Sequence, residues 1–235
     1  MPYLERGGTK MNSQTLNATI FGYSASYFNA EFEGILGKII ICYNLMIANK
    51  VVLPNNENRI RNELTFNYLN RNEVRREIGI SKYLFEPESP TKDNLGRTDI
   101  KIISDKTFED TNAYYIIECK RLDDENINGT TGLNAKYIDE GIARFTNEQK
   151  YPFYSDTAGM IGFIVSKMNI RENVDCINKL LQNAFNQIDT VKGLTKKQIT
   201  PDFEYSYYSN HKVEKSTRII YHLMFDFSNS IAIDS

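Results

Sequence analysis

Two carboxylates and an amine lie in the middle of the chain at a spacing that suits metal-assisted chemistry. Asp99 opens an alternating apolar stretch, and Glu118-Cys119-Lys120 ends a more continuously apolar one. If both stretches are strands, alternation puts the Glu118 and Lys120 side chains on one face and Cys119 on the other. A hairpin between the two strands would bring Asp99 beside them. The sequence therefore predicts that two carboxylates and an ammonium group meet at one point.

Such a cluster favours a divalent cation. Ionised groups near the interior of a sheet lose hydration, and neighbouring carboxylates repel each other. A cation between the carboxylates relieves both costs. Carboxylate oxygens suit Mg²⁺ or Mn²⁺, which lower the pKa of bound water and stabilise charge on a phosphoryl oxygen. Lys120 would orient the attacking water or offset developing negative charge.

These residues resemble the motif of the PD-(D/E)XK nuclease superfamily, which has the restriction-endonuclease-like fold. Glu118-Cys119-Lys120 matches the Glu-X-Lys part, and Asp99 matches the acidic residue before it, although Thr98 replaces the usual proline. The resemblance implies that Asp99, Glu118 and the Cys119 carbonyl bind the metal. It also implies that Lys120 assists the nucleophilic water. It covers roughly residues 57–165.

The resemblance implies two further groups. Many members of the superfamily use a glutamate on the helix before the first core strand, and Glu57 matches that role best, with Glu63 as the alternative. A helix after the lysine often faces the scissile phosphate, which makes Arg144 and Gln149 candidates for that contact. Arg144 is equally explained by an ion pair with Glu140, one helical turn earlier.

Simpler interpretations exist for the other residues as well. Glu118 and Lys120 could form an ion pair on a solvated sheet face, and Glu57 could be a favourable charge at a helix N-terminus. The arginines between residues 59 and 76 could follow a phosphate backbone or simply face solvent. The tyrosines at 205, 207 and 208 are expected to pack in the core rather than stack on bases.

Hydrophobic periodicity predicts the elements that must position these residues. Helices are expected at 26–50, 57–76, 134–150 and 170–190, and strands at 98–103, 113–120, 159–165 and 218–225. Pro87, Pro90 and Gly96 predict a loop before the first strand, and a polar turn-like segment should join the first two strands. Residues 1–25 are expected to be a loosely packed entry segment.

The expected architecture is one α/β domain over residues 1–235, with a mixed central sheet flanked by helices. Within it we distinguish an N-terminal helical extension (1–50), a nuclease core (57–165) and C-terminal helix and strand elements (166–235). The chain of 235 residues and 27.1 kDa fits one such domain.

Composition narrows the function classes. Three cysteines at wide spacing and two histidines disfavour a disulfide framework, a Cys/His metal site and a histidine-based triad. The formal net charge of −2 means that any basic surface for nucleic acid must be local. The apolar run at 35–47 is too short to span a bilayer, and the start of the chain has no signal-peptide core. We therefore expect a cytoplasmic protein without membrane contact.

The function expected from these features is metal-dependent hydrolysis of phosphodiester bonds with Mg²⁺ or Mn²⁺. The expected substrate is double-stranded DNA, and the expected role is in restriction or phage defence. One alternative keeps the fold as an inactive module that binds nucleic acid or protein. The other is an RNA-cleaving effector subunit that a partner activates. Symmetric cutting of a duplex would require a homodimer.

Overall fold

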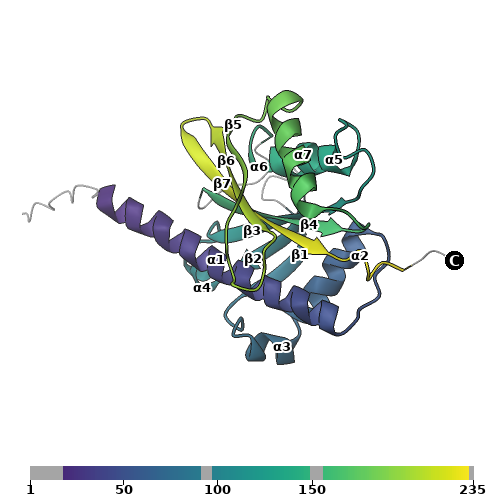
Figure 1. Cartoon of the computed structure of the whole chain (residues 1–235). Coiled ribbons are helices and arrows are strands. Elements are labelled where there is room, and N and C mark those ends of the chain that lie inside the picture. Colours follow the sequence, from purple (N-terminus) through teal and green to yellow (C-terminus); the bar gives the residue numbers. More distant parts are fainter. Residues whose placement is uncertain (1–17, 91–96, 149–155, 233–235) are drawn as a thin grey trace, which may run out of the picture.

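The structure, a computed structural model, describes residues 18–90, 97–148 and 156–232. Its centre is a mixed seven-stranded sheet with the strand order β1-β2-β3-β4-β7-β6-β5 (Figure 1). The strands are β1 (Leu84–Pro90), β2 (Arg97–Ile103), β3 (Tyr114–Leu122), β4 (Thr157–Ile164), β5 (Thr190–Lys196), β6 (Ser206–Val213) and β7 (Ser216–Asp226). Only the β3–β4 and β4–β7 pairs are parallel. The α/β class and the mixed sheet flanked by helices are confirmed.

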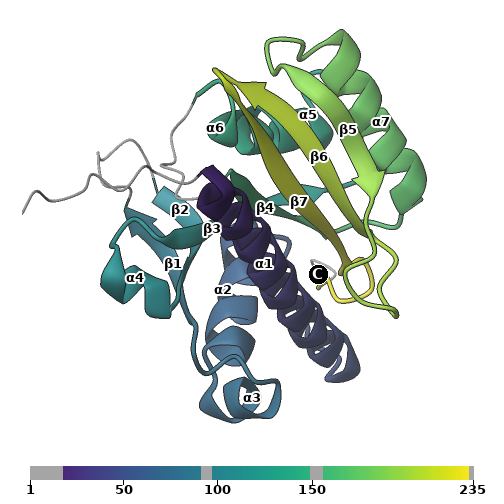
Figure 2. The ribbon, with the colours of Figure 1, turned by 90° about the vertical axis from the view of Figure 1, so that its left-hand side faces the viewer.

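Helices cover both faces of this sheet. Figure 2 shows α1 crossing one face with α2 and α3 beside it, while α5, α6 and α7 lie against the other. The helical elements are α1 (Ala18–Ala48), α2 (Glu57–Asn62), the π-helical η1 (Glu63–Leu69), α3 (Asn72–Glu77), α4 (Asp105–Glu109), α5 (Leu133–Tyr137), the π-helical η2 (Ile138–Ile142), α6 (Ala143–Phe145) and α7 (Ile170–Asn183). None of the helices in the described ranges is long and apolar enough to cross a membrane.

Alternation along the central strands creates one apolar core on each face. In β3, Tyr115, Ile117 and Cys119 belong to the core beneath α1, whereas Ile116 and Leu122 belong to the core beneath α5 and α7. Glu118 and Lys120 share the parity of Ile116, so the strand directs them towards the α5–α6 side.

The first helix is an integral layer of the fold. Its residues Phe32, Leu36 and Ile39 are fully buried against the sheet. Polar contacts reinforce this packing, because Glu31 accepts hydrogen bonds from the hydroxyls of Tyr83 and Tyr115 at 3.0 and 2.9 Å. The helix expected at 26–50 is therefore present, but it begins already at Ala18 and forms part of the main core. The expectation of a loosely packed segment at 1–25 was wrong for residues 18–25, which are helical, and its remaining residues lie outside the described part of the chain.

Several expected boundaries were wrong. The helix predicted at 57–76 is divided into α2, η1 and α3. α2 continues directly into η1, whereas η1 and α3 are separated where the Asn70 side chain bonds the backbone of Phe85 and Arg71 is extended. The helix predicted at 134–150 is likewise divided into α5, η2 and α6. The polar segment between β2 and β3 contains the short helix α4, whose N-terminus Ser104 caps together with Thr107.

Hydrophobic periodicity did not predict three of the strands. The segment with Pro87 and Pro90, expected to be a loop, is strand β1. Proline is tolerated there because β1 is an edge strand, where some backbone N–H groups need no partner in the sheet. β5 is the other edge and carries few apolar residues. β6 contains Tyr207, which is buried in the core, as expected for the tyrosines.

A buried chain of hydrogen bonds crosses β6 and β7 on the α5 side. Ser209 Oγ lies 2.7 Å from both His211 Nε2 and His222 Nε2. His222 Nδ1 lies 2.8 Å from the Tyr137 hydroxyl, and His211 Nδ1 lies 3.2 Å from Thr190 Oγ1. Burial lowers the pKa of His211 to about 4, and burial together with the nearby His211 lowers that of His222 well below its usual value.

This chain predicts acid sensitivity. An unfolded histidine takes up a proton below about pH 6.5, but folded His211 does so only near pH 4. The contribution of the buried neutral histidines to the free energy of unfolding is therefore fully present above pH 6.5. As the pH falls from 6.5 to 4, the free energy of unfolding decreases by about 1.4 kcal/mol per pH unit for each histidine. Urea unfolding at pH 7, 6 and 5 should show this loss. His211→Gln should reduce the slope by about 1.4 kcal/mol per pH unit, and an unchanged slope would contradict the assignment.

Candidate functional site

The end of the β2–β3 ladder positions Asp99. The two strands are antiparallel, as the hairpin prediction required, and Ile100 pairs with Ile117 at the inner end of the ladder. One position further, the Cys119 backbone N–H donates to Asp99 Oδ2 at 2.8 Å. The carboxylate thus takes a backbone donor at the point where the two strands separate, and this contact holds Asp99 against β3.

Lys120 lies at the centre of a ring of oxygens. Its Nζ is 2.9 Å from Glu118 Oε1, 3.0 Å from the Cys119 carbonyl oxygen and 3.2 Å from Glu57 Oε1. Asp99 Oδ2 is 3.9 Å away. These oxygens belong to β2, β3 and α2, so the tertiary fold brings together all four residues that the sequence nominated. Glu118 is 0% and Lys120 7% exposed, and the solvated-face interpretation of this pair was therefore wrong.

Glu57 reaches the cluster from the first turn of α2. Asn56 caps this helix, because its side chain accepts a hydrogen bond from the Arg59 N–H. Glu57 Oε2 accepts from the Arg121 backbone N–H at 3.0 Å, which fixes the carboxylate beside β3. Of the two glutamates that the sequence left open, Glu57 is the one in the cluster, whereas Glu63 accepts from the Asn67 side chain at an exposed position.

Arg61 is a member of the cluster that the sequence argument missed. It is only 1% exposed, and its Nη1 donates to Asp99 Oδ1 at 2.8 Å. Its Nη2 lies 2.5 Å from Glu88 Oε1 on β1. The sequence feature that could have indicated this role is the position of Arg61 one helical turn after Glu57 and next to the apolar Ile60. We had grouped it with the surface arginines of that segment, and the structure corrects this.

Arg144 contacts the same Glu118 oxygen that Lys120 contacts. Its Nη1 lies 2.6 Å from Glu118 Oε1, and this ion pair crosses from α6 to β3. The sequence left a phosphate contact and a Glu140 pair open, and Glu118 was not among the partners considered. Gly141 of η2 packs over β4, where a Cβ would lie 2.5 Å from the end of the Met160 side chain. The other phosphate candidate, Gln149, lies outside the described residues.

The charges of the cluster compensate one another. The carboxylates in contact are those of Asp99, Glu118, Glu57 and Glu88. The cations that they contact are Lys120, Arg61, Arg144 and, at Glu88, Arg97. Burial lowers the pKa of Lys120, but Glu118, Asp99 and Glu57 outweigh burial and raise it above its ordinary value. Lys120 therefore stays protonated at neutral pH and acts here as a cation, not as a base.

The donor set matches a hard divalent cation in type but not in its present spacing. Carboxylate and carbonyl oxygens are magnesium ligands, yet magnesium requires oxygens at about 2.0–2.1 Å. In the described part of the chain, no three His, Cys, Asp or Glu side chains stand close enough, as they are, to hold a metal ion. The oxygens converge instead on the Lys120 ammonium, so a metal would take the place of a cation already present. Magnesium binding here would require both that Lys120 moves aside and that the carboxylate oxygens come closer together.

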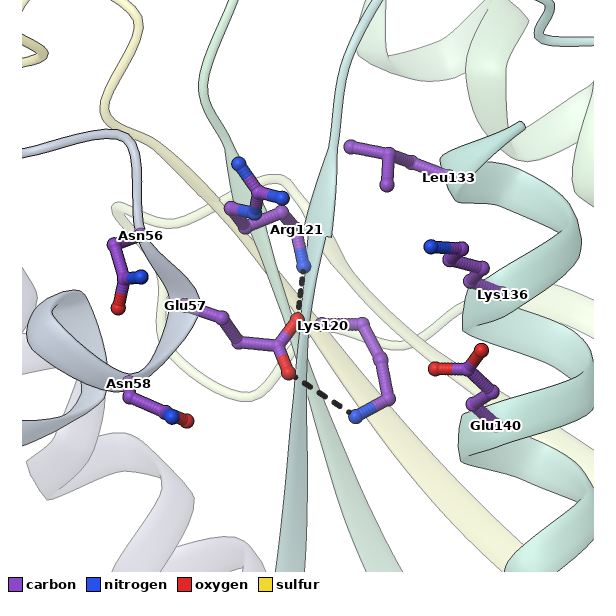
Figure 3. Close-up of a pocket in the computed structure, with 8 residues that line it drawn as sticks. All are labelled: Asn56, Glu57, Asn58, Lys120, Arg121, Leu133, Lys136 and Glu140. Carbon is purple, nitrogen blue, oxygen red and sulfur yellow. Dashed lines mark hydrogen bonds and ion pairs between the residues drawn. The ribbon is translucent and has the colours of Figure 1, made fainter.

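A polar cavity opens next to the cluster. It has a volume of about 230 Å³ and is lined by Asn56, Glu57, Asn58, Lys120, Arg121, Leu133, Lys136 and Glu140. Figure 3 shows Glu57 and Lys120 between the two walls of this cavity, with α2 on one side and the helix carrying Lys136 and Glu140 on the other. The carboxylate cluster is thus buried but borders a solvent-accessible space.

Comparisons with family models, curated proteins and solved structures found no match for this chain.

Proposed function

We propose that this protein is a magnesium-dependent phosphodiesterase that cleaves nucleic acid, with DNA as the first substrate to test. The observation that carries the proposal is the convergence of oxygens from Glu118, Cys119, Glu57 and Asp99 on one cationic atom. The cluster is buried and lies beside an open polar cavity. The resemblance of these residues to the PD-(D/E)XK motif supports the nucleic-acid substrate.

In this proposal, Asp99, Glu118, Glu57 and the Cys119 carbonyl would hold the metal. Bound magnesium would supply Lewis-acid stabilisation of the phosphoryl charge and a more acidic water. Arg61 donates to Asp99 Oδ1, while Oδ2 accepts from the Cys119 N–H and lies 3.9 Å from Lys120 Nζ. Lys120, released from the centre of the ring, would orient the attacking water and offset negative charge at the phosphate. Arg144 holds the Glu118 carboxylate through Oε1, the oxygen that also faces Lys120.

Cleavage assays test the proposal directly. Supercoiled plasmid, linear duplex and single-stranded RNA should be incubated with magnesium, manganese or EDTA. We expect cleavage of DNA that requires the metal and that Asp99→Asn abolishes. Metal-dependent cleavage of RNA alone would favour the ribonuclease alternative. Binding of DNA without cleavage in either metal would favour the inactive module, for which the complete internal charge compensation of the cluster is the specific argument.

Glu57 and Glu63 provide a matched pair of variants. Glu57→Gln should lower the cleavage rate by about 10–100-fold, because it removes one charged oxygen from the proposed metal site while it preserves shape. Glu63→Gln changes the same chemical group one turn and a half later, outside the cluster, and should leave the rate unchanged. Equal rates for both variants would exclude Glu57 from the reaction. The rates are measured under single-turnover conditions with a labelled duplex.

A further inference from the structure

The cavity beside Lys120 contains two cations that the carboxylate cluster does not use. Arg121 donates through Nη1 to the backbone and side-chain oxygens of Asn55, which carry no charge. Lys136 is exposed on α5, and no ion pair with it occurs in the described part of the chain. Lys120 and Glu57, by contrast, neutralise each other at 3.2 Å.

The formal charges of the cavity lining favour one monovalent anion. Lys120, Arg121 and Lys136 are positive, and Glu57 and Glu140 are negative, so the lining carries a net charge of +1. A phosphodiester carries one negative charge and would balance it. The volume of about 230 Å³ is far larger than one water molecule needs and leaves room for a phosphate with part of its sugar.

The donors in the cavity have the chemistry of a phosphate site. Arginine binds phosphate through paired N–H groups, and lysine does so as a point charge. Asn56 and Asn58 border the same space and offer side-chain amides of the kind that contact phosphates in nucleic-acid complexes. Lys136 and Arg121 stand on opposite elements, α5 and β3, so a ligand between them would be held from two sides (Figure 3).

We propose that this cavity is a subsite for the phosphate adjacent to the scissile one, bound by Arg121 and Lys136. The inference rests on the proposed function, because the scissile phosphate is placed at Lys120. Lys120 lines both the cluster and the cavity, so a strand that presents one phosphate to the cluster extends naturally into this space. The subsite fixes the register of the substrate and carries no sequence information.

Binding measurements with matched variants test the subsite. Lys136→Met is compared with Lys212→Met, which removes an exposed lysine from β6, three strands away from β3. Both are made in the Asp99→Asn background, so that a labelled duplex remains intact in magnesium. Lys136→Met should weaken binding about tenfold and reduce the slope of log affinity against log salt by about 1. Lys212→Met should change neither quantity, and melting temperatures confirm that both variants fold.

Duplexes that carry a single uncharged backbone linkage locate the phosphate that Lys136 contacts. A duplex series in which one phosphate at a time is replaced by a methylphosphonate should contain one position at which Lys136→Met causes no further loss. That position should adjoin the bond that the wild-type protein cuts. At the same position, Arg121→Gln should also cause no further loss of affinity. If the wild type cleaves DNA but Lys136→Met and Lys212→Met bind the duplex equally well, the subsite proposal is overturned and the proposed function stands. Absence of any nucleic-acid binding by the wild type would overturn both proposals.

Discussion

Replacement of Lys120 by methionine is expected to produce the largest change of any single substitution in this protein. The variant leaves Glu118, Glu57 and Asp99 without their shared ammonium. Breaking a buried ion pair costs about 3–5 kcal/mol, which for a chain of this size corresponds to a melting temperature lower by about 10 °C. If the proposed function holds, cleavage should fall by about 10²–10³-fold, as for the loss of one group that stabilises transition-state charge.

Magnesium should partly restore the stability of Lys120→Met. In the wild type a metal must displace the ammonium, whereas in the variant the oxygens are already free. At a concentration of one hundred times the dissociation constant, a bound ion contributes about 2.7 kcal/mol. Thermal melts in EDTA and in magnesium should therefore differ more for the variant than for the wild type, with Lys212→Met as the control.

The opposite result would contradict the shared position of lysine and metal. If magnesium raises the melting temperature of the wild type and of Lys120→Met by the same amount, the ion does not bind where the ammonium lies. If Lys120→Met is as stable as Lys212→Met in EDTA, the carboxylates do not depend on Lys120 for charge compensation. Neither measurement requires catalytic activity, so both remain informative for an inactive binding module.

Arg61→Met is expected to have the second-largest effect on stability. The substitution keeps much of the aliphatic volume but removes the guanidinium that bridges Asp99 and Glu88. Because Asp99 is then left buried without its strongest donor, the free energy of unfolding should fall by about 3–5 kcal/mol. Arg59→Met removes an exposed arginine from the same helix and should stay within about 0.5 kcal/mol of the wild type.

Arg61→Lys separates the charge of Arg61 from its geometry. A single ammonium cannot reproduce the planar fork that reaches two carboxylates, so lysine should recover only part of the lost stability. Urea unfolding monitored by circular dichroism measures all three variants. Full recovery by lysine would show that charge alone suffices, and a loss in Arg59→Met equal to that in Arg61→Met would show that the buried contacts are not what stabilises the fold here.

Local pattern by itself determined most of the elements that carry the site. Alternation in residues 98–103 and the apolar run that ends at Lys120 predicted two strands, and both form the expected antiparallel pair. The same two-residue period placed Glu118 and Lys120 on one face. The helix around Glu57 and the strand at β4 also follow from periodicity, because their apolar positions recur with the period of the element that they form.

Other elements depended on their place in the sheet. β1 contains two prolines and is a strand only because it lies at the edge, where an unpaired backbone position has little cost. The break between η1 and α3 occurs where Asn70 contacts Phe85 on β1, and the spacing of apolar residues within the segment does not predict it.

The tertiary structure alone decided how the charges of the site are paired. Arg61, Arg59 and Arg75 look alike in the sequence, yet only the packing of α2 against β3 brings Arg61 to Asp99 and buries it. Arg144 pairs with Glu118 because the fold places α6 next to the buried end of β3. The position of a charge along the chain predicts which helix or strand face it occupies. The partner it meets depends on how separate elements pack, since residues as distant in sequence as Glu57 and Lys120 meet only in the folded chain.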